Sequence, residues 1–179
     1  KAIRIPNRLS FDVEFYSKKL LKLAEDEIGH LYPADEKGNK PIAYYWARVG
    51  TCSNPSCKAE VPLLKQFYLA NTTAKQVYLN PIIVANKIDF EIKKGIFDAE
   101  SWMSRGNLIC PCCGNTTDVK NLKNQFLEGR TLERLLAVIW ETKEGKIYKL
   151  PTKIDVESIN SVPLDTERPT EKMPVEYTQ

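Results

Sequence analysis

Four of the five cysteines fall in two close pairs, and this pattern constrains the fold more than any other feature of the sequence. The second pair lies in the run Cys-Pro-Cys-Cys-Gly at residues 110–114. A gap of two residues lets one tight turn point the sulfurs of Cys110 and Cys113 at a single metal ion, while amides of the turn donate to the thiolates. Gly114 follows at a point where the chain tends to need a positive φ. The run is typical of a zinc knuckle.

The first pair, Cys52 and Cys57, has a gap of four residues, at the loose end of zinc-ligand spacing. Asn54-Pro55 marks a turn inside this gap, and Lys58 stands where a knuckle prefers glycine. The long stretch between the pairs must contain strands that bring them together. The predicted metal ligands are Cys52, Cys57, Cys110 and Cys113.

Four thiolates saturate a tetrahedral Zn²⁺ ion and leave no open position that could activate water. We therefore expect a structural zinc, with no catalytic and no cofactor-binding residue in the chain. Rubredoxin-like iron is the alternative ion, but such sites usually use two Cys-x-x-Cys-Gly knuckles and this sequence has one. We expect Cys112 to be a spare small side chain in the turn; the alternative is that it replaces Cys110 or Cys113 as a ligand.

The sequence contains no pattern of a common catalytic or nucleotide-binding site. Gly-x-Gly-x-x-Gly, Walker A, His-Glu-x-x-His and Gly-x-Ser-x-Gly are all missing. His30 is the only histidine, which argues against a Ser-His-Asp or Cys-His catalytic set. Because it lies at the end of a predicted helix, a capping or packing role is expected for it.

Cysteine usage and hydropathy predict a cytoplasmic location. Five is an odd number for a secreted disulfide scaffold, and metal binding in a reducing compartment explains the close pairs better. The N-terminus lacks the apolar region of a secretion signal, and no apolar run approaches the roughly 20 residues of a membrane-spanning helix. The sequence starts at Lys1 without a methionine, so we expect an excised segment; processing of the N-terminus would leave the same trace.

The net charge of +3 is too small to indicate nucleic-acid binding by itself. From Lys153 onward, three basic and six acidic residues give −3, which leaves +6 on residues 1–152. A mildly basic body could follow phosphate groups. Solubility explains the same charge and is the favoured interpretation.

The first 40 residues read as an N-terminal helical segment. Residues 10–28 place apolar side chains at steps of three and four, with charged residues on the other faces, which predicts an amphipathic helix. Ser10 is the expected N-cap, and Gly29 is placed to end the helix. We expect the apolar stripe to pack on the rest of the chain, or on a neighbouring domain. The stripe consists of Val13, Tyr16, Leu20, Leu23, Ala24 and Ile28.

Residues 41–151 read as a mostly antiparallel β domain of the zinc-ribbon type, with a long insertion between the two knuckles. The predicted fold class is therefore α+β. Residues 42–49 are dense in aromatic and β-branched side chains, and residues 88–92 alternate apolar and charged as a half-exposed strand does. Further strands are expected at 77–79, 82–84 and 107–109.

The region after the second knuckle predicts a short helix at residues 117–127. Residues 135–140 and 146–150 flank a Glu-Gly turn and indicate a hairpin, with a helix over residues 131–141 as the rival interpretation. Several prolines and few apolar residues indicate that residues 152–179 form an extended, poorly packed tail.

Two surface features could point to nucleic acid. The aromatic run Tyr44-Tyr45-Trp46 could stack on bases, although core packing is the favoured interpretation, because neighbours in a strand point to opposite faces. Four basic residues could form a patch, although charged surface helices look the same. They are Lys120, Lys123, Arg130 and Arg134.

Several runs form an ordered set along residues 15–151. They are Glu-Asp-Glu-Ile-Gly-His-Leu-Tyr-Pro at 25–33, Ala-Tyr-Tyr-Trp-Ala-Arg at 43–48, the first knuckle with Ala-Glu-Val-Pro-Leu at 59–63, the second knuckle, the stretch at 128–138 and Gly-Lys-Ile-Tyr at 145–148. This set resembles the DUF1156 family, adenine-specific DNA methylases that contain a zinc ribbon. The chain departs from the family at Lys58, where glycine is usual, and after Pro151.

The resemblance implies that this chain corresponds to an insert between two catalytic motifs of a methyltransferase. One is a glycine-rich DPF-type loop that binds S-adenosylmethionine, and the other is an Asn-Pro-Pro-Tyr-type motif that holds the amine of a flipped adenine. Neither occurs here, since Asn54-Pro55 and Asn80-Pro81 lack the second proline and the aromatic residue. We therefore expect the segment to be inactive alone, with S-adenosylmethionine bound only by the parent protein.

The implied partners are DNA and the catalytic methyltransferase domain of the same parent chain, and no membrane. The zinc ribbon would then engage target DNA or act as a scaffold between domains. The alternative function is a stand-alone zinc-ribbon module that binds protein or nucleic acid without methylation.

Overall fold

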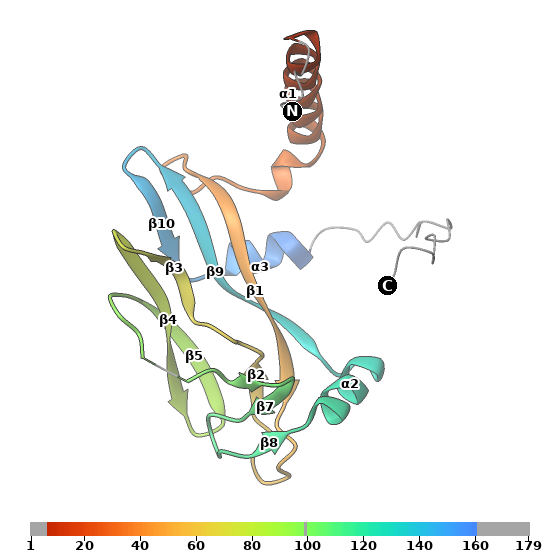
Figure 1. The fold of residues 1–179 in the computed structure, drawn as a ribbon, viewed down its shortest axis with the longest axis vertical. Coiled ribbons are helices and arrows are strands. Elements are labelled where there is room, and N and C mark those ends of the chain that lie inside the picture. The colour runs from red at the N-terminus through yellow and green to blue at the C-terminus, as the bar shows by residue number, and fades with distance from the viewer. Residues whose placement is uncertain (1–6, 99, 161–179) are drawn as a thin grey trace, which may run out of the picture.

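The computed structural model describes residues 7–98 and 100–160, and it has one long N-terminal helix and three small sheets (Figure 1). The helices are α1 (Asn7–Ile28), the 3₁₀ turn η1 (Gly29–Leu31), α2 (Val119–Leu127) and α3 (Lys153–Asn160). The strands are β1 (Lys40–Thr51), β2 (Glu60–Pro62), β3 (Tyr68–Thr72), β4 (Lys75–Val84), β5 (Lys87–Lys94), β6 (Met103–Ser104), β7 (Asn107–Ile109), β8 (Thr116–Thr117), β9 (Leu132–Thr142) and β10 (Gly145–Lys149). Every strand pair among the described residues is antiparallel, so the predicted α+β class with mostly antiparallel strands is confirmed.

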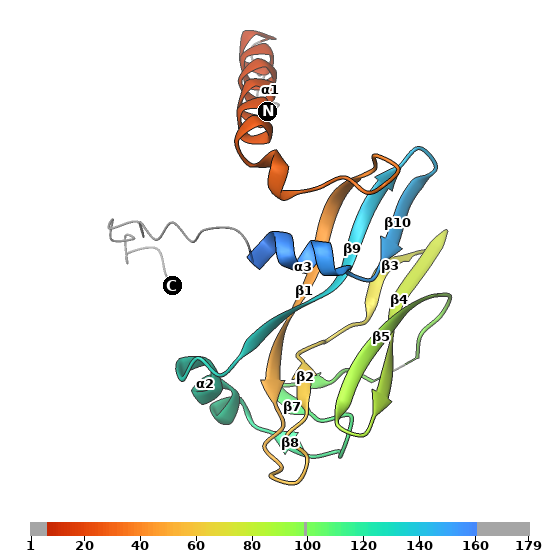
Figure 2. The ribbon, with the colours of Figure 1, turned by 180° about the vertical axis from the view of Figure 1, so that it is seen from behind.

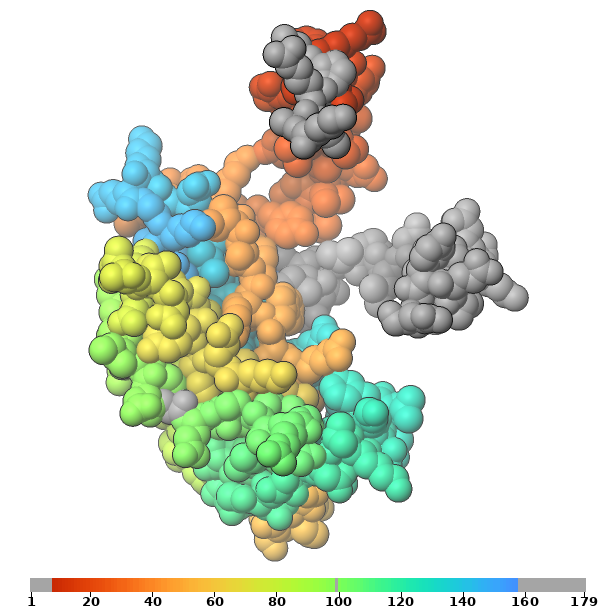
Figure 3. Space-filling view, viewed as in Figure 1, coloured from red at the N-terminus to blue at the C-terminus, as the bar shows by residue number. Residues whose placement is uncertain are grey.

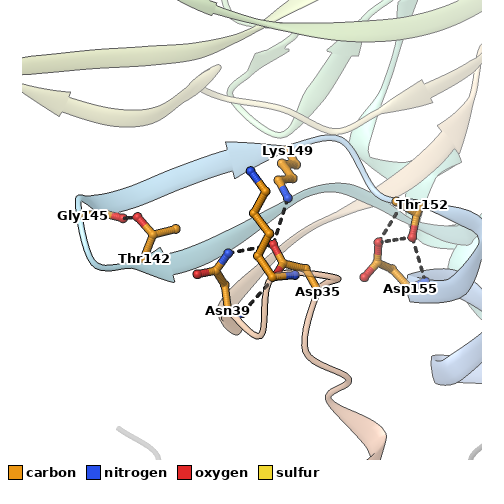
Figure 4. Close-up of polar contacts among 8 residues, drawn as sticks. Asp35, Asn39, Thr142, Gly145, Lys149, Thr152 and Asp155 are labelled. Carbon is orange, nitrogen blue, oxygen red and sulfur yellow. Dashed lines mark hydrogen bonds and ion pairs between the residues drawn. The ribbon is translucent and has the colours of Figure 1, made fainter.

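The largest sheet has the strand order β10-β9-β1-β2 and is built on the long pairing of β1 with β9. β9 turns back into β10, and Thr142 Oγ1 donates to the carbonyl of Gly145 at 2.6 Å across the turn (Figure 4). The predicted hairpin is therefore confirmed, and the rival helix over residues 131–141 is wrong. β9 carries apolar side chains on both of its faces, so the sequence pattern alone could not distinguish a strand from a helix here.

Strand β4 runs through Pro81 and joins two stretches that the sequence analysis treated as separate strands. β3 pairs with the first half of β4 only, between Tyr68↔Tyr78 and Thr72↔Lys75, whereas β5 pairs with β4 from Val77 to Val84. At Pro81 the strand is therefore the edge of its sheet on one side. A proline, which has no N–H to donate, is tolerated there.

Two apolar clusters pack against β1 and β9. The larger cluster fills the space between this sheet, the β3-β4-β5 sheet and the two cysteine turns, and the smaller one consists of Leu135, Val138 and Trp140. Tyr45 packs on the larger cluster and Tyr44 on the smaller one, as neighbours in a strand should. Core packing is thus found for both tyrosines, but Trp46 remains 41% exposed.

Helix α1 stands away from the body of the protein (Figure 3). None of its described side chains is buried, and its C-terminal end is tied to β1 by an ion pair between Glu25 and Lys40. The expectation that its apolar stripe packs on the rest of the chain is therefore wrong for the described residues. The helix already contains Ser10, which is thus not its N-cap, and it ends before Gly29 as predicted. His30 lies exposed in η1, so it has no packing role.

Helix α3 occupies part of the segment for which an extended tail was expected, and it crosses the face of β1 and β9 opposite to the β3-β4-β5 sheet (Figures 1 and 2). Thr152 and Asp155 form a reciprocal cap at its start: the Thr152 amide and hydroxyl donate to Asp155 Oδ2 at 2.6 and 2.7 Å (Figure 4). This arrangement satisfies donors that would otherwise lack partners. The rest of the predicted tail, residues 161–179, lies outside the described residues.

The loop between η1 and β1 is fixed to the β9–β10 hairpin by Asp35. This carboxylate accepts from the Asn39 side chain at 2.9 Å and pairs with Lys149 at 3.1 Å (Figure 4). The hydrogen bond from Asn39 is the main cause that holds the pKa of Asp35 well below its usual range, and Lys149 acts in the same direction. No helix among the described residues is both long enough and apolar enough to span a bilayer.

Candidate metal centre

The two cysteine pairs lie in the turns of two β-hairpins, and the fold brings these turns together. Cys52 follows β1 and Cys57 comes shortly before β2, while Cys110 follows β7 and Cys113 comes shortly before β8. The four Sγ atoms all lie within 4.8 Å of one another. Paired hairpin turns that converge on four sulfurs are compatible with a zinc ribbon.

The spacing of the sulfurs fits a tetrahedral metal ion. The Sγ atoms of Cys52 and Cys113 are 3.7 Å apart, and those of Cys57 and Cys110 are 3.8 Å apart. A tetrahedron with metal–sulfur bonds of about 2.3 Å has edges of about 3.8 Å. A disulfide would need about 2.05 Å, and all five cysteines are free. The donor set therefore has the size and the chemistry of a zinc-thiolate centre.

Both turns have the same backbone design although their gaps differ. The amide of Cys52 donates to the carbonyl of Ala59, and the amide of Cys110 donates to the carbonyl of Asn115, each at 2.9 Å. In both cases the acceptor lies two residues after the second cysteine of the pair. The residue directly after that cysteine has a positive φ in both turns, 50° at Lys58 and 72° at Gly114. Lys58 thus adopts the conformation for which the knuckle prefers glycine, as the sequence mismatch implied.

The surroundings of the sulfurs act on their ionisation in two opposite directions. Burial raises the pKa of Cys52 to about 12, although the Asn54 amide acts against it, and burial raises the pKa of Cys110 to about 11. A hydrogen bond from the Asn115 amide lowers the pKa of the exposed Cys113 to about 7. Amides directed at buried sulfurs are the donors that a metal-bound thiolate uses. A divalent ion would supply the charge that makes these buried thiolates stable.

A polar cluster of Ser53, Asn115 and Thr117 joins the two hairpin turns directly. Thr117, which is fully buried, accepts from the Ser53 amide at 2.9 Å and also bonds to the Ser53 hydroxyl at 3.1 Å. The Asn115 side chain donates to the same hydroxyl at 2.9 Å. These contacts fix one turn on the other without using the sulfurs.

Helix α2 positions the end of β1, from which Cys52 follows. The buried side chain of Gln125 pairs with both backbone groups of Thr51, accepting from its amide at 2.8 Å and donating to its carbonyl at 2.9 Å. A Cβ at Gly50 would lie 2.8 Å from a methyl group of Leu122 on the same helix. The glycine therefore lets the helix approach the strand closely.

The sequence analysis missed the residues that support the centre. Asn86, in the turn between β4 and β5, donates to the carbonyl of Cys57 at 2.7 Å and thus attaches the long insertion to the first turn. Nothing near Asn86 in the sequence connects it with Cys57. Ser53 and Thr117 lie within a few residues of the cysteines, so their small hydroxyl side chains were the available signal.

The other candidate residues do not join the centre. Cys112 is half-buried in the second turn and is not one of the four clustered sulfurs, and burial raises its pKa. His30 is not part of the cluster either. Comparison of the chain with known protein families, with curated proteins and with solved structures finds no match.

Two of the four basic residues singled out in the sequence form ion pairs. Arg134 pairs with Asp89 at 2.8 Å and Arg130 pairs with Glu128, so both are partly neutralised. Lys120 and Lys123 lie exposed on α2. The guanidinium of Arg48, on β1, lies 5.3 Å from the ring centre of Phe126 on the same helix, and this arginine was not predicted as part of a patch.

We predict that Thr117→Val destabilises the protein by about 0.5–1.5 kcal/mol, because the hydrogen bonds of the buried Thr117 hydroxyl to the Ser53 amide and hydroxyl are lost. Thr116→Val is the matched control, since Thr116 is exposed next to it in β8. The free energy of unfolding from urea titration of the zinc-loaded proteins measures both effects. Equal values for the two variants would contradict the role assigned to Thr117.

Zinc affinity should fall steeply with falling pH. Cys52 and Cys110 have pKa values raised to about 12 and about 11, so near pH 7.5 they are protonated in the metal-free protein and zinc must displace at least these two protons. We expect the apparent affinity to drop at least about 100-fold for each pH unit below 7.5. Competition with a zinc chelator between pH 6.5 and 7.5 measures it. A change of less than tenfold per unit would show that these thiols do not bind the metal.

Proposed function

We propose that this chain is the zinc-ribbon module of a DNA adenine methyltransferase and that its Zn²⁺ ion is structural. The observation that carries the proposal is the cluster of four cysteine sulfurs at tetrahedral spacing. The resemblance of the ordered sequence runs to zinc-ribbon adenine methylases supports the parent activity. Chemical preference supports zinc, since it readily takes four thiolates in a closed site.

The bound ion would cross-link the two hairpins and leave no position for substrate. Cys52, Cys57, Cys110 and Cys113 would hold it, while the surrounding amides stabilise the thiolates. The chain therefore contributes a rigid platform, and methyl transfer belongs to the catalytic domain of the parent protein.

The surface beside the metal centre supports contact with DNA. Lys120 and Lys123 project from α2 one turn apart, and Arg48 lies over Phe126 near the end of the same helix. Arg130 and Arg134 each form an ion pair, whereas these three cations form none with the described residues. Glu133 lies opposite Arg48 in the sheet and is the nearest acidic neighbour in the strand pairing. We propose that this surface contacts DNA phosphates.

Metal analysis of two cysteine variants tests the zinc centre. We expect one zinc per chain in the wild type, and Cys112 as the one thiol that reacts before the metal is removed. Cys113→Ser should lose the zinc and most of the folded state, since structural zinc binding is worth on the order of 10 kcal/mol in small peptides. Cys112→Ser is the matched control and should keep the metal at a cost of about 1 kcal/mol. Zinc bound equally by both variants would refute this ligand set.

Titration with duplex DNA tests the proposed surface. The double variant Lys120→Ala/Lys123→Ala should bind more weakly and reduce the slope of log affinity against log salt by about 2, because two phosphate contacts are lost. Lys143→Ala/Lys146→Ala removes the same charge from the β9–β10 hairpin, at the other end of β9, and should leave the slope unchanged. Wild-type protein without salt-dependent binding would restrict the module to scaffolding between domains.

The encoding reading frame tests the methyltransferase parent independently. We expect a DPF-type loop and an Asn-Pro-Pro-Tyr-type motif on either side of this segment. A stop codon directly after Gln179, with neither motif upstream, would favour the stand-alone binding module.

A further inference from the structure

Helix α1 carries an apolar seam that the described part of the chain leaves uncovered. The seam residues recur at steps of four, three, four and three, which is the spacing of a coiled coil. All five lie on one side of the helix, and between 51% and 68% of each side chain is exposed. They are Leu9, Val13, Tyr16, Leu20 and Leu23.

This helix needs a partner to be stable in water. It has 22 residues, spans roughly 33 Å, and contacts the body through η1 and the ion pair of Glu25 with Lys40 at its C-terminal end (Figure 3). Helices in proteins gain most of their stability from packing of an apolar face. Outside the seam, Phe11 and Phe15 stack on each other with ring centres 6.3 Å apart. Phe15 also meets Tyr16 edge-on at 5.3 Å, which still leaves Tyr16 63% exposed.

The charges beside the seam identify the partner. Asp12 and Lys19 directly precede Val13 and Leu20, so they occupy equivalent positions on one flank of the seam, one heptad apart and of opposite sign. The other flank carries only small side chains, at Ser10, Ser17 and Ala24. Flanking charges of this kind set the orientation and register of a helix pair.

We propose that α1 pairs with α1 of a second copy of this chain in an antiparallel arrangement. In this register Leu9 packs on Leu20 of the second copy, and Val13 packs on Tyr16 of the second copy. Asp12 then faces Lys19 of the second copy. The two-fold symmetry produces this ion pair twice.

Other pairings of two copies lack this complementarity. Full overlap of two antiparallel helices places Glu27 in the seam against Leu9 and brings the two Lys19 side chains together. A parallel pair in register places Asp12 beside Ser17 and Lys19 beside Ala24, so neither charge gains a partner on the second helix, and Asp12 keeps only its exposed pair with Arg8 of its own helix at 3.7 Å. The proposed register also keeps the two bodies at opposite ends of the helix pair.

Charge exchange tests the pairing on the full 179-residue zinc-loaded chain, by sedimentation equilibrium at low salt. Wild type should form a dimer. Asp12→Lys alone and Lys19→Asp alone should each weaken the dimer about tenfold, since each creates two like-charge contacts, and the double variant should restore it. Leu20→Glu should give monomers, with zinc content showing that the body remains folded.

Lys22→Asp is the matched control, because Lys22 lies away from the seam and its charge change should leave the dimer constant unaltered. A wild-type chain that stays monomeric at 100 µM overturns the proposal, as does a dimer that the double variant fails to restore. The outcome is independent of DNA binding, which is measured on α2.

Discussion

Four cysteine sulfurs that lie within 4.8 Å of one another set the condition on which the rest of the fold depends. Three of these residues are buried, so ionised sulfurs would repel one another in a site that water cannot screen. A divalent cation would resolve this conflict and would at the same time connect two hairpins that are more than fifty residues apart in the sequence. The hairpins hold their strands in two different sheets, so the cysteine cluster lies where these sheets meet.

The cysteine cluster is supported by polar contacts that hold the surrounding segments in place. Ser53 and Thr117 connect the turns, Asn86 attaches the β4–β5 hairpin, and Gln125 fixes the end of β1. The side chains of Thr117, Asn86 and Gln125 each bond to a backbone group of another segment. The long insertion between the two cysteine pairs therefore helps to support the first knuckle. This contact helps two cysteine pairs that lie far apart in the sequence to form one centre.

Local sequence signals predicted the parts of this protein that depend on local chemistry. The convergence of the cysteine pairs, the β9–β10 hairpin and the short helix near residue 120 all follow from spacing, turn residues and periodicity. The supporting contacts of Asn86 and Gln125 did not, because they join segments that are 29 and 74 residues apart. The α3 helix was missed for another reason: nearby prolines suggested a tail, while Thr152 and Asp155 carried the signal of a helix cap.

Strand β1 has a property that bears on how the parts of the molecule work together. It is a single element of 12 residues, with the base of α1 at one end and Cys52 directly after the other. A strand of that length spans roughly 40 Å, and it pairs with β9 along most of its length, with register shifts between Pro41 and Ala43 and between Tyr45 and Trp46. Strand β1 therefore sets the distance between the base of α1 and the two cysteine turns.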